Sequence, residues 1–116
     1  MRSLLSALLF AAACGMSDAP SDGLPPGTVI VDWHVGATGL STSIRDGEFV
    51  AWRSGDGMHH TVTWISTPAA LDEVDVPGGG TSTAVHFITP GNYRYSCSIH
   101  GETVESGNVH VLPPGT

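Results

Sequence analysis

From Thr28 onward, short segments rich in β-branched and aromatic residues alternate with clusters of Gly, Pro, Asp and Asn. Within the segments, apolar and polar side chains alternate at a period of two, which is typical of strands with one buried face. We expect no long helix, although residues 68–75 are compatible with one or two helical turns. The pattern predicts an all-β fold, an antiparallel sandwich or barrel. The segments are TVIVDW, FVAWRS, HTVTWIS, TAVHFI, YRYSC and NVHVL.

Chain length allows one domain of this kind. The chain has 116 residues, and the alternating segments lie within residues 28–112. The remainder is too short for a second core. We therefore expect one monomeric domain over residues 28–112 and a short C-terminal tail over residues 113–116.

The N-terminal residues have the features of an export signal. A positive Met1-Arg2 start precedes an apolar stretch that is too short to span a bilayer, and three alanines then lead to Cys14. This pattern predicts a signal peptide over residues 1–13 and resembles bacterial lipoprotein signals, in which the cysteine becomes the lipid-bearing first mature residue. The alternative is an ordinary secretory signal with an incidental Cys14. Both predict an exported protein, periplasmic or at the cell surface. The lipoprotein would also be membrane-attached through a flexible tether, residues 14–27.

The chain is strongly acidic. It has four basic residues, all Arg, against 11 Asp and Glu, for a formal net charge of −7. Removal of residues 1–13 would take away Arg2, and 3 minus 11 gives −8. Such a charge disfavours binding to nucleic acid and would steer a partner protein with a basic surface, although it could serve solubility alone.

One cysteine and two histidines suggest a metal site. Cys97 and His100 lie three positions apart at the end of an expected strand, so one loop can direct a thiolate and an imidazole at the same point. If Cys14 is lipidated, Cys97 has no disulfide partner in an oxidising compartment, and metal ligation would explain its free thiol. His60 begins another expected strand and could supply a second imidazole. Two imidazoles and one thiolate are the ligand set of blue-copper sites.

The order of these motifs resembles that of cupredoxins, namely plastocyanins, amicyanins and pseudoazurins. The resemblance covers residues 28–112 and rests on a V-x-W strand, the motif H-T-V-T and the run I-T-P-G-N-Y-x-Y-x-C-x-x-H. It implies a Greek-key β-sandwich that binds one copper ion. The ion would alternate between Cu(I) and Cu(II), and the protein would carry electrons to a redox partner protein rather than act as an enzyme.

The resemblance also implies the ligands His60, Cys97 and His100. His59 is an alternative to His60, but H-T-V-T matches the family when His60 is the ligand, and neighbours on a strand point to opposite faces. Thr61 would then be available to hydrogen-bond to the Cys97 loop.

Glu105 stands where the family has a weak axial methionine. It could bind copper, turn to solvent and leave the axial place to water, or be displaced by a change of loop register. A carboxylate about 3 Å from the ion, at an effective dielectric constant of about 20, would favour Cu(II) by about 5 kcal/mol, or about 0.2 V. A hydrogen bond from the Ile99 N–H to the thiolate would act in the opposite direction, but more weakly.

A second function is consistent with the same residues. The ligand types resemble those of the red-copper protein nitrosocyanin, which also has two His, one Cys and a Glu. If Glu105 left the axial position open, the site could bind small molecules or be redox-reactive. The low-potential electron carrier and this reactive copper site are therefore the two hypotheses.

Overall fold

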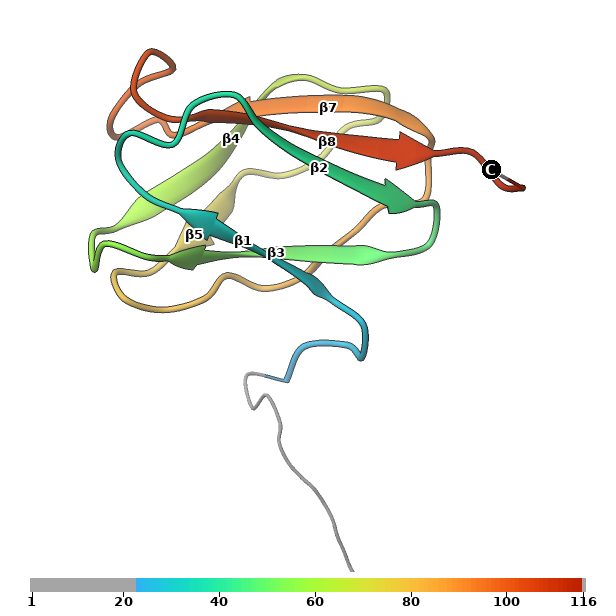
Figure 1. Cartoon of the computed structure of the whole chain (residues 1–116), viewed down its shortest axis with the longest axis horizontal. Coiled ribbons are helices and arrows are strands. Elements are labelled where there is room, and N and C mark those ends of the chain that lie inside the picture. Colours follow the sequence, from blue (N-terminus) through green and yellow to red (C-terminus); the bar gives the residue numbers. More distant parts are fainter. Residues whose placement is uncertain (1–22, 116) are drawn as a thin grey trace, which may run out of the picture.

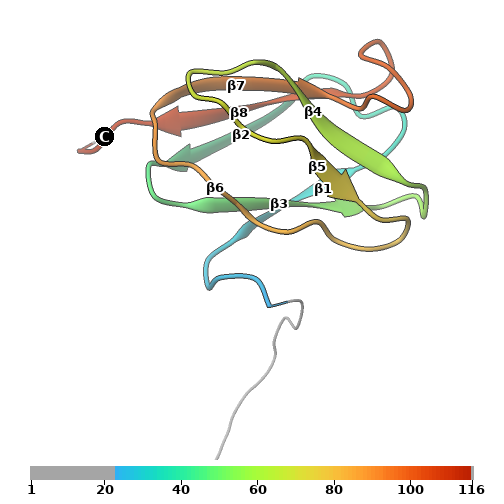
Figure 2. The ribbon, with the colours of Figure 1, turned by 180° about the vertical axis from the view of Figure 1, so that it is seen from behind.

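The computed structural model describes residues 23–115 as two β-sheets packed face to face (Figures 1 and 2). One sheet has three strands in the order β1-β3-β6, and the other has five in the order β2-β8-β7-β4-β5. The chain passes repeatedly between the sheets, as in Greek-key sandwiches. The predicted all-β sandwich is therefore confirmed. The strands are β1 (Val29–Trp33), β2 (Leu40–Arg45), β3 (Phe49–Ser54), β4 (His60–Ser66), β5 (Val74–Val76), β6 (Val85–His86), β7 (Gly91–Ser96) and β8 (Ser106–Leu112).

The sheets are mixed rather than wholly antiparallel. β1 pairs with β3, and β2 with β8, in parallel, whereas the other pairs are antiparallel. The expectation of an antiparallel fold was wrong for these two pairs. The reason is the connectivity, because β1, β2 and β3 alternate between the two sheets, and β1 and β2 each lie beside a strand from later in the chain.

Two strands differ from the sequence-based expectation. β2 was not predicted, because LSTSIR is mostly small and polar and only Ile44 in it is fully buried. The helical turns considered for residues 68–75 are absent from that described segment, which ends in the strand β5. Val74 and Val76 are buried there while Asp75 is exposed, so the period of two holds even in three residues.

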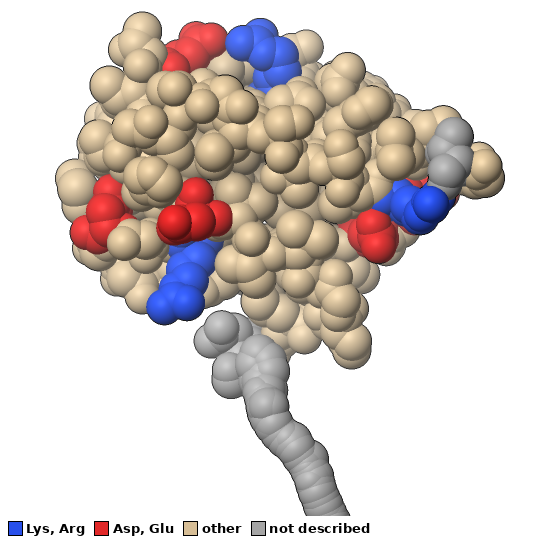
Figure 3. All heavy atoms as spheres, in the orientation of Figure 1, with Lys and Arg blue, Asp and Glu red and all other residues tan. Residues whose placement is uncertain are grey.

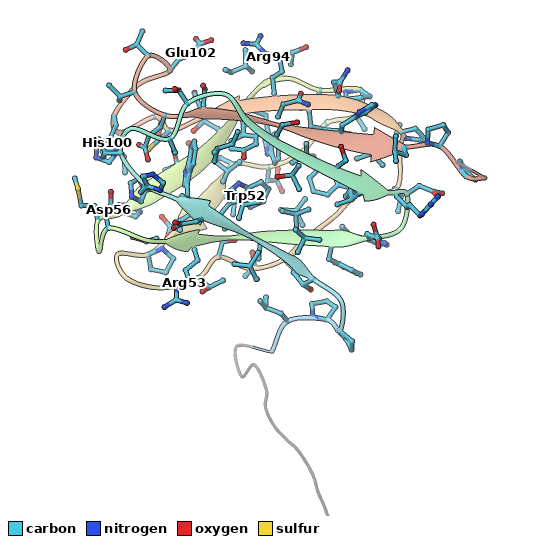
Figure 4. The ribbon with its side chains drawn as sticks, in the orientation of Figure 1. Trp52, Arg53, Asp56, Arg94, His100 and Glu102 are labelled. Atoms are coloured by element: carbon cyan, nitrogen blue, oxygen red, sulfur yellow. The ribbon has the colours of Figure 1, made fainter. Side chains whose placement is uncertain are left out.

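Aromatic rings fill the space between the sheets. Trp52 lies in the interior (Figure 4) and contacts Tyr95 edge to face, with ring centroids 5.3 Å apart. Tyr95 in turn contacts Trp33 at 5.2 Å, and the Trp33 ring lies 6.3 Å from that of His60. Since Trp33, Trp52, Tyr95 and His60 are all fully buried, a rigid aromatic core directly supports one histidine of the candidate site.

The predicted signal peptide (1–13), Cys14 and most of the predicted tether lie outside the described residues. Within residues 23–115, no helix has the length and apolarity needed to cross a bilayer.

Cys97 is a free, buried thiol.

Candidate metal centre

Four side chains converge at one end of the sandwich. His60 is the first residue of β4, Cys97 follows β7, His100 lies in the next loop, and Glu105 directly precedes β8. One potential ligand atom from each lies within 4.8 Å of all the others. Figure 4 places His100 at this end, beside the turn that carries Asp56. The structure thus brings together all four residues that the sequence analysis nominated as metal ligands.

The donor atoms face one another across short distances. The Cys97 Sγ lies 3.5 Å from Nδ1 of His100. The carboxylate of Glu105 spans both imidazoles, with Oε1 2.5 Å from Nδ1 of His100 and Oε2 2.7 Å from Nδ1 of His60. Both histidines therefore present the same ring nitrogen to the cluster. Cys97, His60 and Glu105 are fully buried, and only the His100 side chain reaches solvent, at 17% exposure.

The two adjacent histidines are clearly distinguished. His60 is fully buried in the cluster, whereas His59 is 55% exposed and pairs through Nε2 with Asp75. His60 is the first residue of β4, and His59 lies in the loop directly before it. The structure thus places His60, not His59, beside Cys97 and Glu105.

Asp56 is a site residue that the sequence analysis missed. Its Oδ1 accepts a hydrogen bond from Nε2 of His60 at 2.7 Å and from the Met58 N–H at 3.0 Å, and its Oδ2 accepts one from the Val35 N–H at 2.9 Å. Burial opposes ionisation, but the hydrogen bonds from Val35, His60 and Met58 outweigh it and hold the pKa of Asp56 well below its usual value. The signal in the sequence was the Gly-Asp-Gly turn, in which Asp precedes His60 by four positions.

Thr61 joins β4 to the Cys97 loop, as expected. Its Oγ1 accepts a hydrogen bond from the Ser98 N–H at 2.8 Å, and its own N–H lies 3.4 Å from Sγ of Cys97 as a donor. The hydrogen bond expected from Ile99 to the sulfur does not occur among the described residues. Ile99 instead lies in an exposed turn, so the backbone donor to the thiol comes from the neighbouring strand.

The chemistry of the donors fits a transition metal. Two imidazole nitrogens, one sulfur and one carboxylate oxygen suit copper or zinc. In addition, Nδ1 of His60 and Oε2 of Glu105 are buried without a hydrogen-bond partner. Burying a polar atom without a hydrogen-bond partner lowers the stability of the fold, and a cation bound between these two atoms would give each of them a partner. Met58, whose thioether could also bind a soft metal, lies in the loop before β4 and is 45% exposed.

Similarity to known proteins is evident in structure and not in sequence. A comparison with protein-family models finds no match, and a comparison with curated protein sequences finds none either. Among solved structures, an oxidised amicyanin variant aligns with a TM-score of 0.63 and 20% identity over 78% of this chain and 87% of that chain. The Cu(I) form of another amicyanin variant aligns with a TM-score of 0.60 and 21% identity over the same shares. At these identities, the likeness shows the fold.

Proposed function

We propose that this chain, which has the cupredoxin fold, binds one copper ion and carries single electrons outside the cytoplasm. The observation that supports this most is the convergence of two imidazoles, a cysteine sulfur and a carboxyl group in a buried cluster that has only one edge in solvent. Bound copper would supply the Cu(I)/Cu(II) couple. His60, Cys97 and His100 would hold the ion, and Glu105 would provide a carboxylate oxygen as a further ligand.

The surroundings of the cluster favour electron transfer over catalysis. The aromatic core behind His60 and the Thr61 hydrogen bonds behind Cys97 restrict both side chains. A rigid site changes little between oxidation states, which suits a carrier. We therefore expect the chain to act as an electron carrier and not as an enzyme.

The exposed edge of His100 would be the point of electron exit. Four large apolar side chains in the loops at this end of the sandwich are 36–49% exposed, and a hydrogen bond from the Gly36 N–H to the Val104 carbonyl at 2.9 Å joins two of these loops. An apolar surround lets a partner approach His100 closely without desolvating charge. The four side chains are Val35, Met58, Ile99 and Val104.

Glu105 would make this a low-potential carrier. Its carboxylate is fully buried and directed at both imidazoles, which supports the ligand role over a side chain turned to solvent. A buried negative charge stabilises Cu(II) more than Cu(I). The alternative function, a small-molecule-binding site with an open axial position, needs Glu105 to move away, and the described geometry gives that no support.

The setting is proposed from the sequence. A signal peptide over residues 1–13 would export the chain, and lipid on Cys14 would attach it to a membrane. The acidic charge would steer a basic redox partner. Three acidic residues, Asp72, Glu73 and Asp75, line a groove of about 510 Å³ between β5 and the segment that leads to β6.

The optical and electron paramagnetic resonance spectra of the Cu(II)-loaded full chain test the proposal. We expect an intense thiolate-to-copper band that Cys97→Ser abolishes. His60→Ala should weaken or abolish it as well, whereas the matched variant His59→Ala should leave it intact. Retention of the band in Cys97→Ser would refute the assignment of the thiolate. Added azide should not alter the wild-type spectrum, and a shift would favour the open-site alternative.

A further inference from the structure

The hydrogen bond between Asp56 and His60 determines which nitrogen of the ring is free for a metal. In a neutral imidazole, one nitrogen carries the proton and the other carries a lone pair. His60 Nε2 lies 2.7 Å from Oδ1 of Asp56 with good hydrogen-bond geometry. His60 Nδ1 lies at a similar distance from Glu105 Oε2, but neither of these two atoms has a hydrogen-bond partner. The geometry therefore favours the proton on Nε2 and a lone pair on Nδ1, facing the cluster.

Asp56 is itself held in place from two loops. The Val35 N–H, which follows β1, and the Met58 N–H, which precedes β4, both donate to its carboxylate. The Ser54 hydroxyl donates to the Met58 carbonyl at 2.7 Å and so fixes the same turn. In Figure 4, Asp56 lies at the same end of the sandwich as His100. The carboxylate is thus anchored independently of the ring that it binds.

We propose that Asp56 is a positioning residue for copper, which fixes the orientation and tautomer of His60 and lowers the reduction potential through its charge. Carboxylate partners raise the basicity of ligand histidines, and their loss typically weakens metal binding by about 10- to 100-fold. A more basic imidazole favours Cu(II) over Cu(I). This inference rests on the proposed copper site.

The chain contains its own control for this test. His59, directly before β4, and Asp75 in β5 form a second His–Asp pair, but that pair is exposed and outside the cluster. Asp56→Asn and Asp75→Asn each remove one negative charge and replace the carboxylate partner of a histidine with a neutral amide. Only the first is expected to affect the copper site.

The first measurement is nitrogen NMR of the wild-type, metal-free full chain, at a pH where histidine is neutral. We expect His60 to carry its proton on Nε2. A proton on Nδ1 would overturn the inference without any variant having to fold. This readout is independent of copper, so a chain that binds no copper would end the proposed function while the tautomer would still be decided.

The second measurement compares copper affinities and reduction potentials. We expect Asp56→Asn to lose about 10- to 100-fold in Cu(II) affinity, with a smaller loss for Cu(I). A tenfold difference between the two losses corresponds to a potential about 59 mV higher. Asp56→Glu should recover part of the affinity, and Asp75→Asn should change neither quantity. Equal effects of Asp56→Asn and Asp75→Asn would reduce the role of Asp56 to overall charge and overturn the positioning claim.

Discussion

At the residue scale, Glu105 is the side chain on which the redox chemistry would depend most. Replacing it with Gln removes the charge at nearly constant volume, and replacing it with Met supplies the ligand that cupredoxins usually have at this place. We expect both variants to raise the potential, by up to about 0.2 V, because a charge about 3 Å from the ion no longer stabilises Cu(II). A redox titration of the thiolate band measures this. A potential unchanged in both would show that Glu105 does not bind the ion.

The sequence predicted the members of the cluster but not its surroundings. Cys97, His100 and Glu105 are close in sequence, so local spacing was informative. The strand period indicated that only one of His59 and His60 faces the site, and the resemblance of H-T-V-T to the family motif selected His60. Asp56 was missed because an Asp in a Gly-Asp-Gly turn is common for turn geometry alone. Its hydrogen bond to His60 depends on where Val35 lies, and that is a long-range feature of the fold.

At the scale of elements, the pairing of β7 with β8 depends on a glycine. Tyr95 and Gly107 are cross-strand partners, and a Cβ at Gly107 would lie 2.3 Å from the Tyr95 hydroxyl oxygen. The tyrosine ring therefore covers a position where no other side chain fits. The backbone at Gly107 is not in the left-handed region, so the requirement is one of space.

Gly107→Ala should lower the free energy of unfolding by about 1 to 3 kcal/mol, as overpacking typically does. Chemical denaturation of the full chain measures this. The cost should be smaller in a Tyr95→Leu background, where the hydroxyl and the ring atoms within 3 Å of the added Cβ are gone, and the two substitutions should couple in a double-mutant cycle. Equal costs in both backgrounds would contradict the contact.

The elements show where sequence reasoning succeeds and where it fails. Strands with large alternating side chains, such as β3 and β4, were predicted because burial of one face imposes the period. β2 was missed because its small polar residues carry almost no such signal. The parallel pairings were missed because strand direction depends on which sheet each connection enters, and residue pattern does not encode this.

At the scale of the whole molecule, tyrosine ionisation should dominate the loss of stability at alkaline pH. The chain has two Tyr and no Lys. Burial raises the pKa of Tyr95 to about 12, and it also raises that of Tyr93. The unfolded chain ionises these groups near pH 10, while the folded chain keeps Tyr95 protonated until about pH 12.

The folded state therefore binds more protons than the unfolded state between these two values, and stability must fall as pH rises. We expect Tyr95 alone to lower the free energy of unfolding by about 2 to 3 kcal/mol between about pH 10 and about pH 12. Denaturation across this range, with Tyr95→Phe as the control, checks it. A variant with the same pH dependence as the wild type would contradict the assignment to Tyr95.

Net charge should control how fast small reagents exchange electrons with the protein. The formal net charge of the chain is −7, and Figure 3 shows acidic side chains in separate groups on a mostly uncharged face. For the Cu(I) form, oxidation by a cationic cobalt(III) complex should slow as salt is added, because screening removes the attraction, and oxidation by an anionic one should accelerate. Stopped-flow rates at several ionic strengths measure both. Rates independent of salt would show that the approach to His100 is electrostatically neutral.

The loop between β7 and β8 carries most of the candidate ligands and is separate from the rest of the fold. Residues 97–105 contain three of the four clustered side chains, and only His60 belongs to another part of the sandwich. The aromatic core and both sheets lie outside this short loop. Natural variation or a designed graft could therefore rewrite the donor set at this end of the molecule while the scaffold that stabilises the fold stays the same.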